Sequence, residues 1–382
     1  MYDFIVVGAG PSGSYSAYML GKMGYNVLQL EEDRSVGKPV ECTGVVSKRV
    51  TSMIKTDNVV NRLHGAHIYF PSGKEIHVKK NEETIIIERD RFDQDVSAAA
   101  IGAGVQLSVN SSFISAEPGD GHILVKYRKE GNIVEEKAIA LVGADGAGSM
   151  VRRTLYSDQE ISRKVSAYQV EAAKKMEDQD SVDVYLGSPY SKGFFGWAVP
   201  AGDLSRIGSA GFGMSRESFL NIYKRFLDPS KVSITGGLIP IAPLQKTYSE
   251  RSLLVGDAAG LAKPLTGGGI YTGMLSGKLA AYALDNAYEN EDFSPSSLKT
   301  YQKMWKNEIG GELRKALWVQ KKFANITDSS FNAMGEMLSD PKLSERINNI
   351  GDIDYPTRVV GSILMRKPGL MKHVFFPVKE SG

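Results

Sequence analysis

The chain has 382 residues, of which 46 are Lys or Arg and 44 are Asp or Glu, so its formal net charge is +2. Because the two signs are interspersed, the composition excludes a basic protein built to bind nucleic acid. The single cysteine, Cys42, excludes an intramolecular disulfide and argues against a cysteine-based metal site, so we expect no bound metal. No stretch reaches the roughly 18 apolar residues that a membrane-spanning helix needs, and no basic, apolar leader precedes Tyr2. We expect a cytoplasmic protein whose membrane contact is at most peripheral.

The amino end has the pattern of a β-α-β unit: DFIVVGAG predicts a strand, PSGSYSAYMLGKMG a helix and YNVLQLEED a second strand. Gly8, Gly10 and Gly13 form GxGxxG between the first strand and the helix. The first glycine permits the tight turn, the second lets a pyrophosphate approach the backbone, and the third allows close helix packing. Glu31 follows the apolar VLQL run, where a carboxylate can bind the ribose hydroxyls, with Glu32 as the neighbouring alternative. The unit predicts a dinucleotide site.

A β-rich middle follows. Alternating residues predict strands in HIYFPSGKEIHVKK and a hairpin in GHILVKYRKEGNIVEEKAIALVGAD with its turn at GN, and DRFDQDVSAAAIGAG between them predicts a helix. Further strands are expected at YQVEAA, SVDVYLG, GFFGWAVPAG, SRIGSAGFGM and VSITGGLIPIAP. Beyond Asp292 an apolar residue recurs every four positions, which predicts a helix with one apolar face; these residues are Tyr301, Trp305, Ile309, Leu313 and Leu317.

Two acidic motifs distinguish a flavin from a nicotinamide dinucleotide. LVGADGAGSMVR and LLVGDAAGLAKPLTGGGIYTGM place Asp145 and Asp257 at the ends of apolar strands beside glycine. We expect Asp257 to precede a helix and to accept a hydroxyl of a ribityl chain, although either aspartate alone could be a helix cap. The run Gly267, Gly268 and Gly269 then starts another helix, whose amino terminus would stabilise the negative charge of a reduced flavin. The sequence therefore predicts FAD.

At these residues the chain resembles the FAD-dependent para-hydroxybenzoate hydroxylase superfamily, through GxGxxG, ADGAGSMVR and LLVGDAAG. The resemblance implies that the first three glycines and Glu31 hold the adenosine diphosphate part, that Asp257 holds the ribityl and pyrophosphate, and that the second glycine run holds the isoalloxazine. In ERDRFDQDV, Arg89 fits the superfamily's arginine, with Arg91 as the competing assignment and a surface ion pair as the structural alternative.

Within that superfamily the chain most resembles the geranylgeranyl reductases, including the archaeal enzymes that saturate digeranylgeranylglycerophospholipids. GKPVECTGVVS looks like the family's cysteine-and-glycine segment, which implies that Cys42 lies near flavin and substrate. The family's PxxYxWxFP strand reads KGFFGWAVP here: Trp197 and Pro200 match, while Phe195 replaces the tyrosine. Phe195 and Trp197, two apart on the expected strand, would face a long apolar substrate together; ordinary sheet core is the alternative. The same residues also resemble a halogenase motif, WxWxIP.

The expected fold is α/β, a Rossmann-like FAD-binding domain with an inserted antiparallel β-sheet substrate domain and a C-terminal helical region. We place the FAD-binding domain at 1–61, 84–157 and 250–290, the substrate domain at 62–83 and 158–249, and the helical region at 291–382.

The preferred hypothesis is an FAD-dependent reductase that saturates isolated double bonds of polyprenyl lipid chains. Hydride would come from reduced flavin and a proton from Cys42 or water. NAD(P)H or a ferredoxin-like protein would supply the electrons. The alternatives are an FAD-dependent aromatic monooxygenase or halogenase-like enzyme, and a non-catalytic isoprenoid-binding flavoprotein. The segment from Arg358 to Lys379 mixes basic and apolar residues and could lie on a membrane surface, or pack on the body of the protein.

Overall fold

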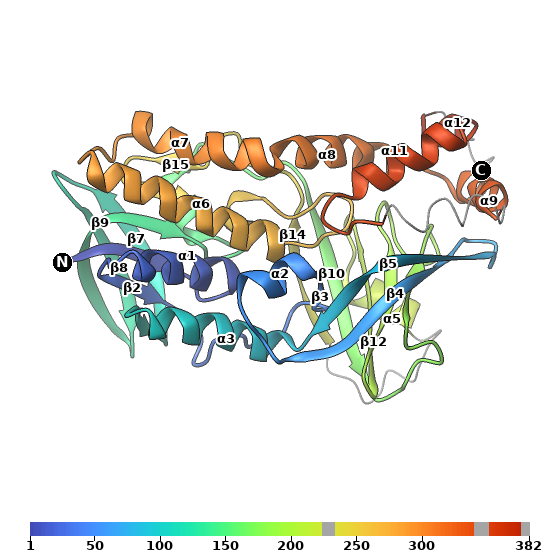
Figure 1. Ribbon diagram of the computed structural model, residues 1–382, viewed down its shortest axis with the longest axis horizontal. Coiled ribbons are helices and arrows are strands. Elements are labelled where there is room, and N and C mark those ends of the chain that lie inside the picture. The colour runs from blue at the N-terminus through green and yellow to red at the C-terminus, as the bar shows by residue number, and fades with distance from the viewer. Residues whose placement is uncertain (224–233, 340–350, 376–382) are drawn as a thin grey trace.

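The computed structural model describes residues 1–223, 234–339 and 351–375. It has two eight-stranded sheets side by side, with helices along the first sheet and beyond the second (Figure 1). This is the α/β architecture expected from the sequence, with the helical region at the carboxyl end confirmed.

The first sheet has the order β15-β16-β9-β1-β2-β6, and β7 and β8 extend it from β9. The strands from β16 to β6 run parallel to one another. Their bounds are β1 Tyr2–Val7, β2 Val27–Leu30, β6 Gln106–Ser108, β7 Ser111–Pro118, β8 Ile123–Lys129, β9 Asn132–Gly143, β15 Tyr248–Ser249 and β16 Ser252–Leu254. Buried parallel strands need apolar residues on both faces, which explains the unbroken FIVV run of β1.

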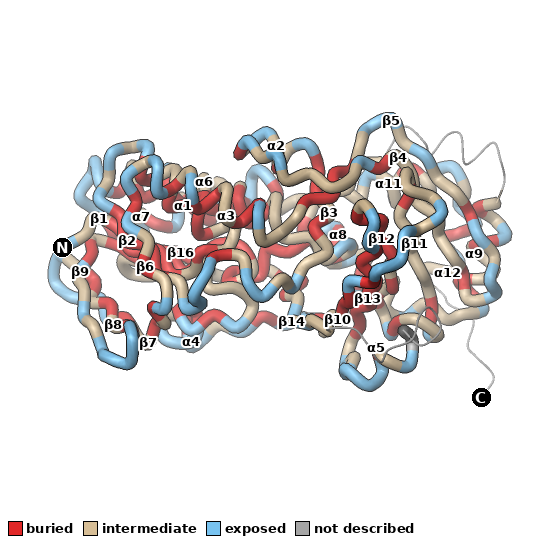
Figure 2. The backbone as a smooth tube through the Cα atoms, turned by 90° about the horizontal axis from the view of Figure 1, so that it is seen from below, coloured by how far each residue is buried: buried red, intermediate tan, exposed pale blue. Residues whose placement is uncertain are grey.

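Helices cover one face of this sheet, and the β7–β8 hairpin and α4 lie on the other (Figures 1 and 2). The covering helices are α1 Pro11–Lys22, α3 Arg89–Gly102 and α6 Ile270–Glu289, and α4 spans Met150–Leu155. Figure 2 shows that β1, β2 and α1 are largely buried. The carboxyl ends of β1, β9 and β16 meet at one edge of the sheet, and a glycine ends or closely follows each strand there, so the acidic and glycine motifs come together.

The expected hairpin between β8 and β9 is present, with its turn one position earlier than expected. Glu130 and Gly131 have positive φ angles, and Asn132 already begins β9. Two consecutive positive φ angles match the right-handed twist of the flanking strands, so the turn forms at Glu130-Gly131.

The second sheet has the order β14-β10-β13-β12-β11-β4-β5-β3 and is antiparallel except for the β11–β4 pair. Its strands are β3 Val45–Ser47, β4 Val59–Tyr69, β5 Glu75–Ile87, β10 Lys164–Ala172, β11 Ser181–Tyr185, β12 Gly196–Ala201, β13 Leu204–Gly211 and β14 Ile234–Pro240. The remaining helices near it are α2 Lys48–Met53 and α5 Arg216–Tyr223. Residues 232 and 233, at the start of the strand expected before Pro243, lie outside the described residues. The domain division remains a proposal. The proposed boundaries place β3 in the FAD-binding domain and cut β5 between residues 83 and 84, although both strands pair within the second sheet.

The helical region begins with α7 Pro295–Trp305, passes through a π-helical turn at Lys306–Gly310, and continues as α8 Gly311–Phe323. The apolar residues repeat every four positions, which in an α-helix drifts by about 40° per repeat. The wider π turn resets that drift, so Tyr301, Trp305, Ile309 and Leu313 are all buried against the first sheet's core. The last helices are α9 Asp328–Leu338, α11 Pro356–Arg366 and α12 Leu370–Phe375.

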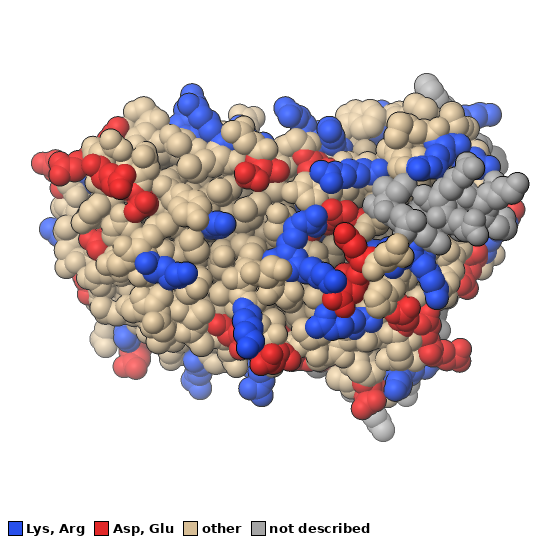
Figure 3. All heavy atoms as spheres, in the orientation of Figure 1, with Lys and Arg blue, Asp and Glu red and all other residues tan. Residues whose placement is uncertain are grey.

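Acidic and basic side chains are interspersed on the face that Figure 3 shows, as the composition suggested. Within the described residues, no helix is long and apolar enough to cross a membrane.

Candidate active site

The turn between β1 and α1 is built from glycines. Gly8 has φ +100°, and a β-carbon there would lie 2.5 Å from the carbonyl oxygen of Ala144. A β-carbon on Gly13 would lie 2.1 Å from the carbonyl oxygen of Gly8, whereas one on Gly10 would meet nothing within 4 Å. Gly8 and Gly13 thus close the turn, and Gly10 leaves open space at the start of α1. Gly10 is also the N-cap of α1 and no side chain caps that helix, so its first amides are available to a ligand.

Glu31 follows directly on β2 and reaches back to this turn. Its Oε2 accepts a hydrogen bond from the Ala9 amide at 2.7 Å, and its Oε1 accepts one from the Asp33 amide at 2.9 Å. Burial raises the pKa of Glu31, although both amides oppose the rise. Glu32 is exposed. The carboxylate beside the glycine turn is therefore that of Glu31.

A second helix start lies against the first because glycines let α6 pack closely on α1. β-Carbons on Gly256 and Gly273 would lie 2.4 Å and 2.1 Å from Ser12 Oγ, and one on Gly277 would lie 2.6 Å from Ser12 O. Gly269 is the N-cap of α6 and, as in α1, no side chain caps it. Two uncapped helix starts therefore share one edge of the sheet.

Asp257 lies in a short 3₁₀ helix, Gly256–Ala259, rather than before an α-helix as expected. The left-handed Gly260 ends that turn, and the α-helix starts only at Ile270. Asp257 still lies beside the start of α6, because a β-carbon on Gly269 would lie 2.8 Å from Asp257 Oδ1. Burial raises the pKa of Asp257 to about 6, with Arg89 opposing the rise. Within the described part of the chain, no group donates a hydrogen bond to this carboxylate.

Asp145 is engaged differently. Its Oδ1 accepts a hydrogen bond from Ser149 Oγ at 2.6 Å and its Oδ2 accepts one from the Val151 amide at 2.9 Å. Burial raises its pKa, and these bonds oppose the rise. This geometry favours the helix-capping role that the sequence left open: Asp145 shapes the loop before α4, and a direct contact with cofactor stays a prediction.

Arg89 begins α3 and its side chain is only 13% exposed, while Arg91 is exposed. The Arg89 Nη2 atom lies 2.8 Å from Asp93 Oδ2. Burial lowers the pKa of Arg89, but the Asp93 carboxylate and the Cys42 sulfur raise it by more, so the pKa stands above its ordinary value. The guanidinium is thus a fixed cation that acts on both Cys42 and Asp257. The structure favours Arg89 over Arg91 as the arginine of the site.

The loop that holds Cys42 is tied to the second sheet by residues that the sequence did not single out. The Gly44 amide donates to Cys42 Sγ at 3.5 Å, and Arg206 Nη1 donates to the Thr43 carbonyl at 2.9 Å. Thr43 Oγ1 donates to Gln169 Oε1 at 2.6 Å, and Trp197 Nε1 donates to the same oxygen at 3.3 Å. Gln169 therefore joins the cysteine loop to the tryptophan of β12.

Trp197 lies on β12, whereas Phe195 lies just before the strand begins at Gly196. The expectation that both lie on one strand is corrected, yet their rings are in edge contact with centroids 6.1 Å apart. Gly208 on β13 makes room for the indole, since a β-carbon there would lie 2.3 Å from Trp197 Cζ2. Pro200, three residues beyond Trp197, alternates to the opposite face of the strand; a contact of Pro200 with substrate stays a prediction.

Phe194, which the sequence reading passed over, connects this aromatic group to the helix start. It is buried and stacks on Phe195 with ring centroids 4.6 Å apart. A β-carbon on Gly267, which has φ +70°, would lie 3.6 Å from Phe194 Cζ. These neighbours form a connected series, which we call the circuit, listed in order: Asp257, Gly269, Gly267, Phe194, Phe195, Trp197, Gln169, Thr43, Cys42 and Arg89. The Arg89 charge acts in turn on Asp257 through its electrostatic field.

Comparison with known proteins identifies the family to which the chain belongs. Residues 1–217 match the family model described as FAD binding domain. A digeranylgeranylglycerophospholipid reductase of Thermoplasma volcanium is 31% identical over 371 residues, covering 90% of this chain and 93% of the relative. The chain belongs to the FAD-dependent geranylgeranyl reductase family.

Two further matches extend over nearly the whole length of the chain. An uncharacterised protein of Methanocaldococcus jannaschii is 33% identical and covers 92% of each chain. The crystal structure of a geranylgeranyl bacteriochlorophyll reductase-like protein from Thermoplasma acidophilum superposes with TM-score 0.86 at 27% identity, covering 98% of each chain. Solved structures of a brominase and a p-nitrophenol monooxygenase share the fold at 14% and 16% identity, which shows the fold alone.

The residues present fit FAD, the cofactor of this reductase family. Two uncapped helix starts offer amides to anionic groups, and Gly10 leaves the space that a pyrophosphate needs. Asp257 presents a carboxylate without a donor in the described chain, and a ribityl hydroxyl would supply that donor. Gln169 carried no sequence motif, because its partners are distant in sequence, and Phe194 lies at a variable position of the KGFFGWAVP segment. The closely spaced Gly273 and Gly277 were the one local signal that could have revealed the α1–α6 contact.

Proposed function

We propose that the protein is an FAD-dependent reductase that saturates isolated double bonds of geranylgeranyl chains in membrane-lipid precursors. The observation that supports this most is the circuit of contacts that brings Cys42, Trp197 and the Gly267–Gly269 run together. The named reductases among the relatives act on digeranylgeranylglycerophospholipids, and we extend that substrate class to this chain.

The aromatic side of the circuit binds the prenyl chain. Phe195 and Trp197 are only partly buried, so their ring surfaces remain for an apolar ligand. Substitution of the family's tyrosine by Phe195 removes a hydroxyl and leaves this surface more apolar. The surface is apolar, and its one indole N–H is already bonded to Gln169. Such a surface favours a long hydrocarbon and gives little recognition of polar groups.

Reduced FAD, when bound, supplies the hydride that forms one new C–H bond. The chain's own residues provide the proton for the second C–H bond and the apolar surface around the alkene. Cys42 Sγ is the proton donor that we favour, with water as the alternative, because hydrogen bonds through Thr43 and Gln169 join its loop to Trp197. An isolated alkene accepts hydride poorly, so proton transfer leads or accompanies it, and the faces of Phe195 and Trp197 stabilise the resulting positive charge.

Electrons must reach the cofactor from outside the chain. The only GxGxxG is the one at Gly8–Gly13, so NAD(P)H or a ferredoxin-like protein docks transiently rather than in a second dinucleotide fold. Anaerobic mixing of the oxidised protein with each donor in turn, followed by the loss of flavin absorbance, identifies which of the two is competent.

We also propose that the carboxyl end contacts the membrane that holds the substrate. Large apolar side chains are exposed there, Trp318 at 52%, Met365 at 78% and Met371 at 45%. Basic residues accompany them on α11, α12 and between the two, namely Arg358, Arg366, Lys367 and Lys372, and Figure 3 shows basic side chains in this region. Apolar and basic groups together favour an anionic membrane surface. Residues 376–379 of the segment expected to lie on the membrane are outside the described residues.

The test is anaerobic. The purified protein is reduced with dithionite, a geranylgeranyl-bearing phospholipid is added, and flavin reoxidation and product mass are followed together. The proposal predicts reoxidation with a mass gain of two hydrogen atoms per double bond. A flavin that stays reduced until air enters, with an oxygen atom then gained by an aromatic substrate, would establish the monooxygenase instead. Bound lipid that never reoxidises the flavin would indicate a carrier.

A further inference from the structure

The outer face of the second sheet carries a polar cluster remote from the FAD residues. His67 on β4 lies directly opposite His77 on β5, and their rings stack with centroids 4.1 Å apart and planes inclined by 5°. Asp183 on β11 pairs with His67 on one side and with Ala198 on β12 on the other. Because Ala198 alternates with Trp197, the histidines lie on the face of the sheet that points away from Trp197.

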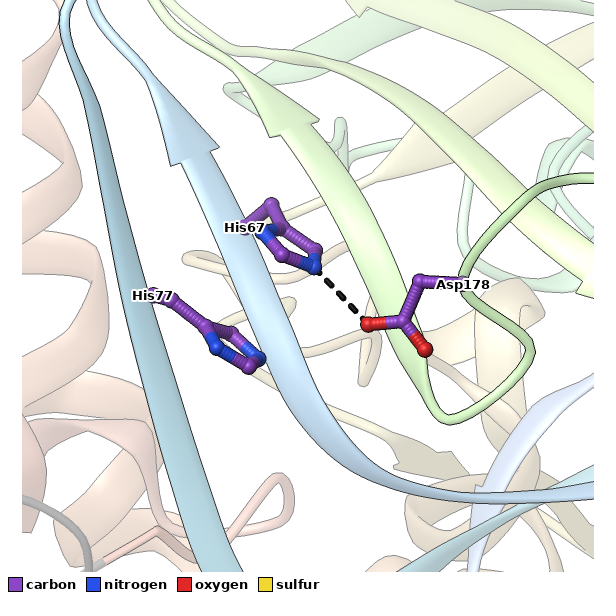
Figure 4. Close-up of side chains that lie close together, drawn as sticks. All are labelled: His67, His77 and Asp178. Carbon is purple, nitrogen blue, oxygen red and sulfur yellow. Dashed lines mark hydrogen bonds and ion pairs between the residues drawn. The ribbon is translucent and has the colours of Figure 1, made fainter.

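Both ring nitrogens of His67 face carboxylates, and Figure 4 shows the contact with Asp178. His67 Nε2 lies 2.9 Å from Asp178 Oδ2, and His67 Nδ1 lies 2.6 Å from Glu75 Oε1. One nitrogen each of His67 and His77 and one oxygen of Asp178 all lie within 4.8 Å of one another. A carboxylate on Nδ1 fixes the ring and leaves Nε2 as the ligand atom, an arrangement common at metal-binding histidines.

The position of His77 is also fixed by its neighbours. His77 Nε2 lies 3.0 Å from Ser181 Oγ. Both atoms occupy the space above Gly65, where a β-carbon would lie 2.9 Å from His77 Nε2 and 2.4 Å from Ser181 Oγ. A side chain at Gly65 would therefore displace the imidazole from His67.

We propose that His67, His77 and Asp178 bind one divalent transition-metal ion of the Zn²⁺ class, with Glu75 orienting His67. Two imidazoles and one carboxylate are ligands that Zn²⁺ prefers, and a water completes the tetrahedron. A tetrahedral ion with bonds near 2.0 Å holds its ligand atoms about 3.3 Å apart, so binding requires these partly exposed side chains to bring their ligand atoms closer than the present 4.8 Å limit. The ion joins the β4–β5 hairpin to the 173–180 connection, whose preceding strand, β10, carries Gln169.

Cobalt serves as the spectroscopic probe. The full-length protein is prepared with FAD, without a histidine tag, and stripped with a chelator before Co²⁺ is added. We expect one equivalent of Co²⁺ to produce the visible absorption of a tetrahedral site, and Zn²⁺ to displace it. His67→Gln and His77→Gln should each weaken binding at least tenfold, and Glu75→Gln should weaken it by about tenfold while leaving one equivalent bound.

His64→Gln is the matched control, because His64 lies on the same strand and contacts Asp180 at 2.7 Å without entering the cluster. It should bind Co²⁺ as the parent protein does. Retained FAD and an unchanged circular dichroism spectrum establish that each variant is folded. If the His67 and His77 variants bind Co²⁺ like the parent, the binding is adventitious. If the parent binds none, the cluster holds a proton between His67 and Asp178. Either result overturns the proposal.

Discussion

Replacing Asp257 by Asn should stabilise the FAD-free protein against unfolding and lower its affinity for FAD. In the folded chain burial raises the pKa of Asp257 to about 6 from an ordinary 3.8. Between these two values the folded state holds more protons than the unfolded state, so stability falls as the pH rises. Integration gives a penalty of at most about 1 kcal/mol at pH 4.5 and about 3 kcal/mol at pH 7.5, which the asparagine removes.

Urea unfolding of the FAD-free protein at both pH values measures this. Asp257→Asn should gain more stability at pH 7.5 than at pH 4.5, by about 2 kcal/mol. FAD titration of the same variant should show binding weaker by at least about tenfold, since a charge-assisted hydrogen bond is lost. Asp292→Asn is the control of opposite sign, because hydrogen bonds from Ser294 lower the pKa of Asp292 and its charged form is favoured in the folded state. An equal effect of Asp257→Asn at the two pH values, or a loss of stability at pH 7.5, would refute the assignment of Asp257 as a buried carboxylate that waits for a donor.

Three further substitutions test other parts of the site. Gly13→Ala would place a β-carbon 2.1 Å from the Gly8 carbonyl oxygen, so α1 must move from the turn and the purified protein should contain little FAD by absorbance. Gly208→Ala would place a β-carbon 2.3 Å from the Trp197 ring; FAD content should be unchanged while kcat/KM for the prenyl lipid falls at least about tenfold, and an unchanged kcat/KM would remove the indole from the substrate surface. Cys42→Ala should leave anaerobic flavin reduction intact and slow lipid-dependent reoxidation by about a hundredfold or more, whereas an unchanged rate would make water the proton source.

Much of the cofactor half of the site could be predicted from the sequence because its signals are local. Gly8, Gly10 and Gly13 lie within one turn, and Glu31 follows the next strand. The contact of Gly13 with the Gly8 carbonyl lies within one turn, so spacing alone could predict it, whereas the approach of Ala144 to Gly8 is long-range. Asp257 was placed correctly at a strand end, but its 3₁₀ turn was not foreseen, since Gly260 in the left-handed region ends the helix after four residues.

The substrate half could not be predicted in the same way because its contacts are long-range. Gln169 bonds Thr43 across 126 positions and Trp197 across 28, and a single glutamine on a strand has no pattern that indicates either partner. In the sequence, Gly208 is simply an unfavourable residue within a strand; only the structure shows that its missing side chain makes room for the Trp197 indole. Only the family motif indicated Trp197, and it carried no information on what holds the ring.

This division follows from what each half must recognise. A dinucleotide has fixed charges and hydroxyls, so helix starts and single carboxylates, which lie on short sequence segments, are sufficient to bind it. A prenyl chain offers only apolar surface, so it is recognised by its shape. The matching binding surface must be assembled from strands that are distant in sequence. Gln169 joins two parts of the substrate half, since its Oε1 accepts one hydrogen bond from Trp197 and another from Thr43 in the Cys42 loop. A change at Gln169 should therefore alter the position of the proton donor and of the substrate surface together, while leaving the FAD residues in place.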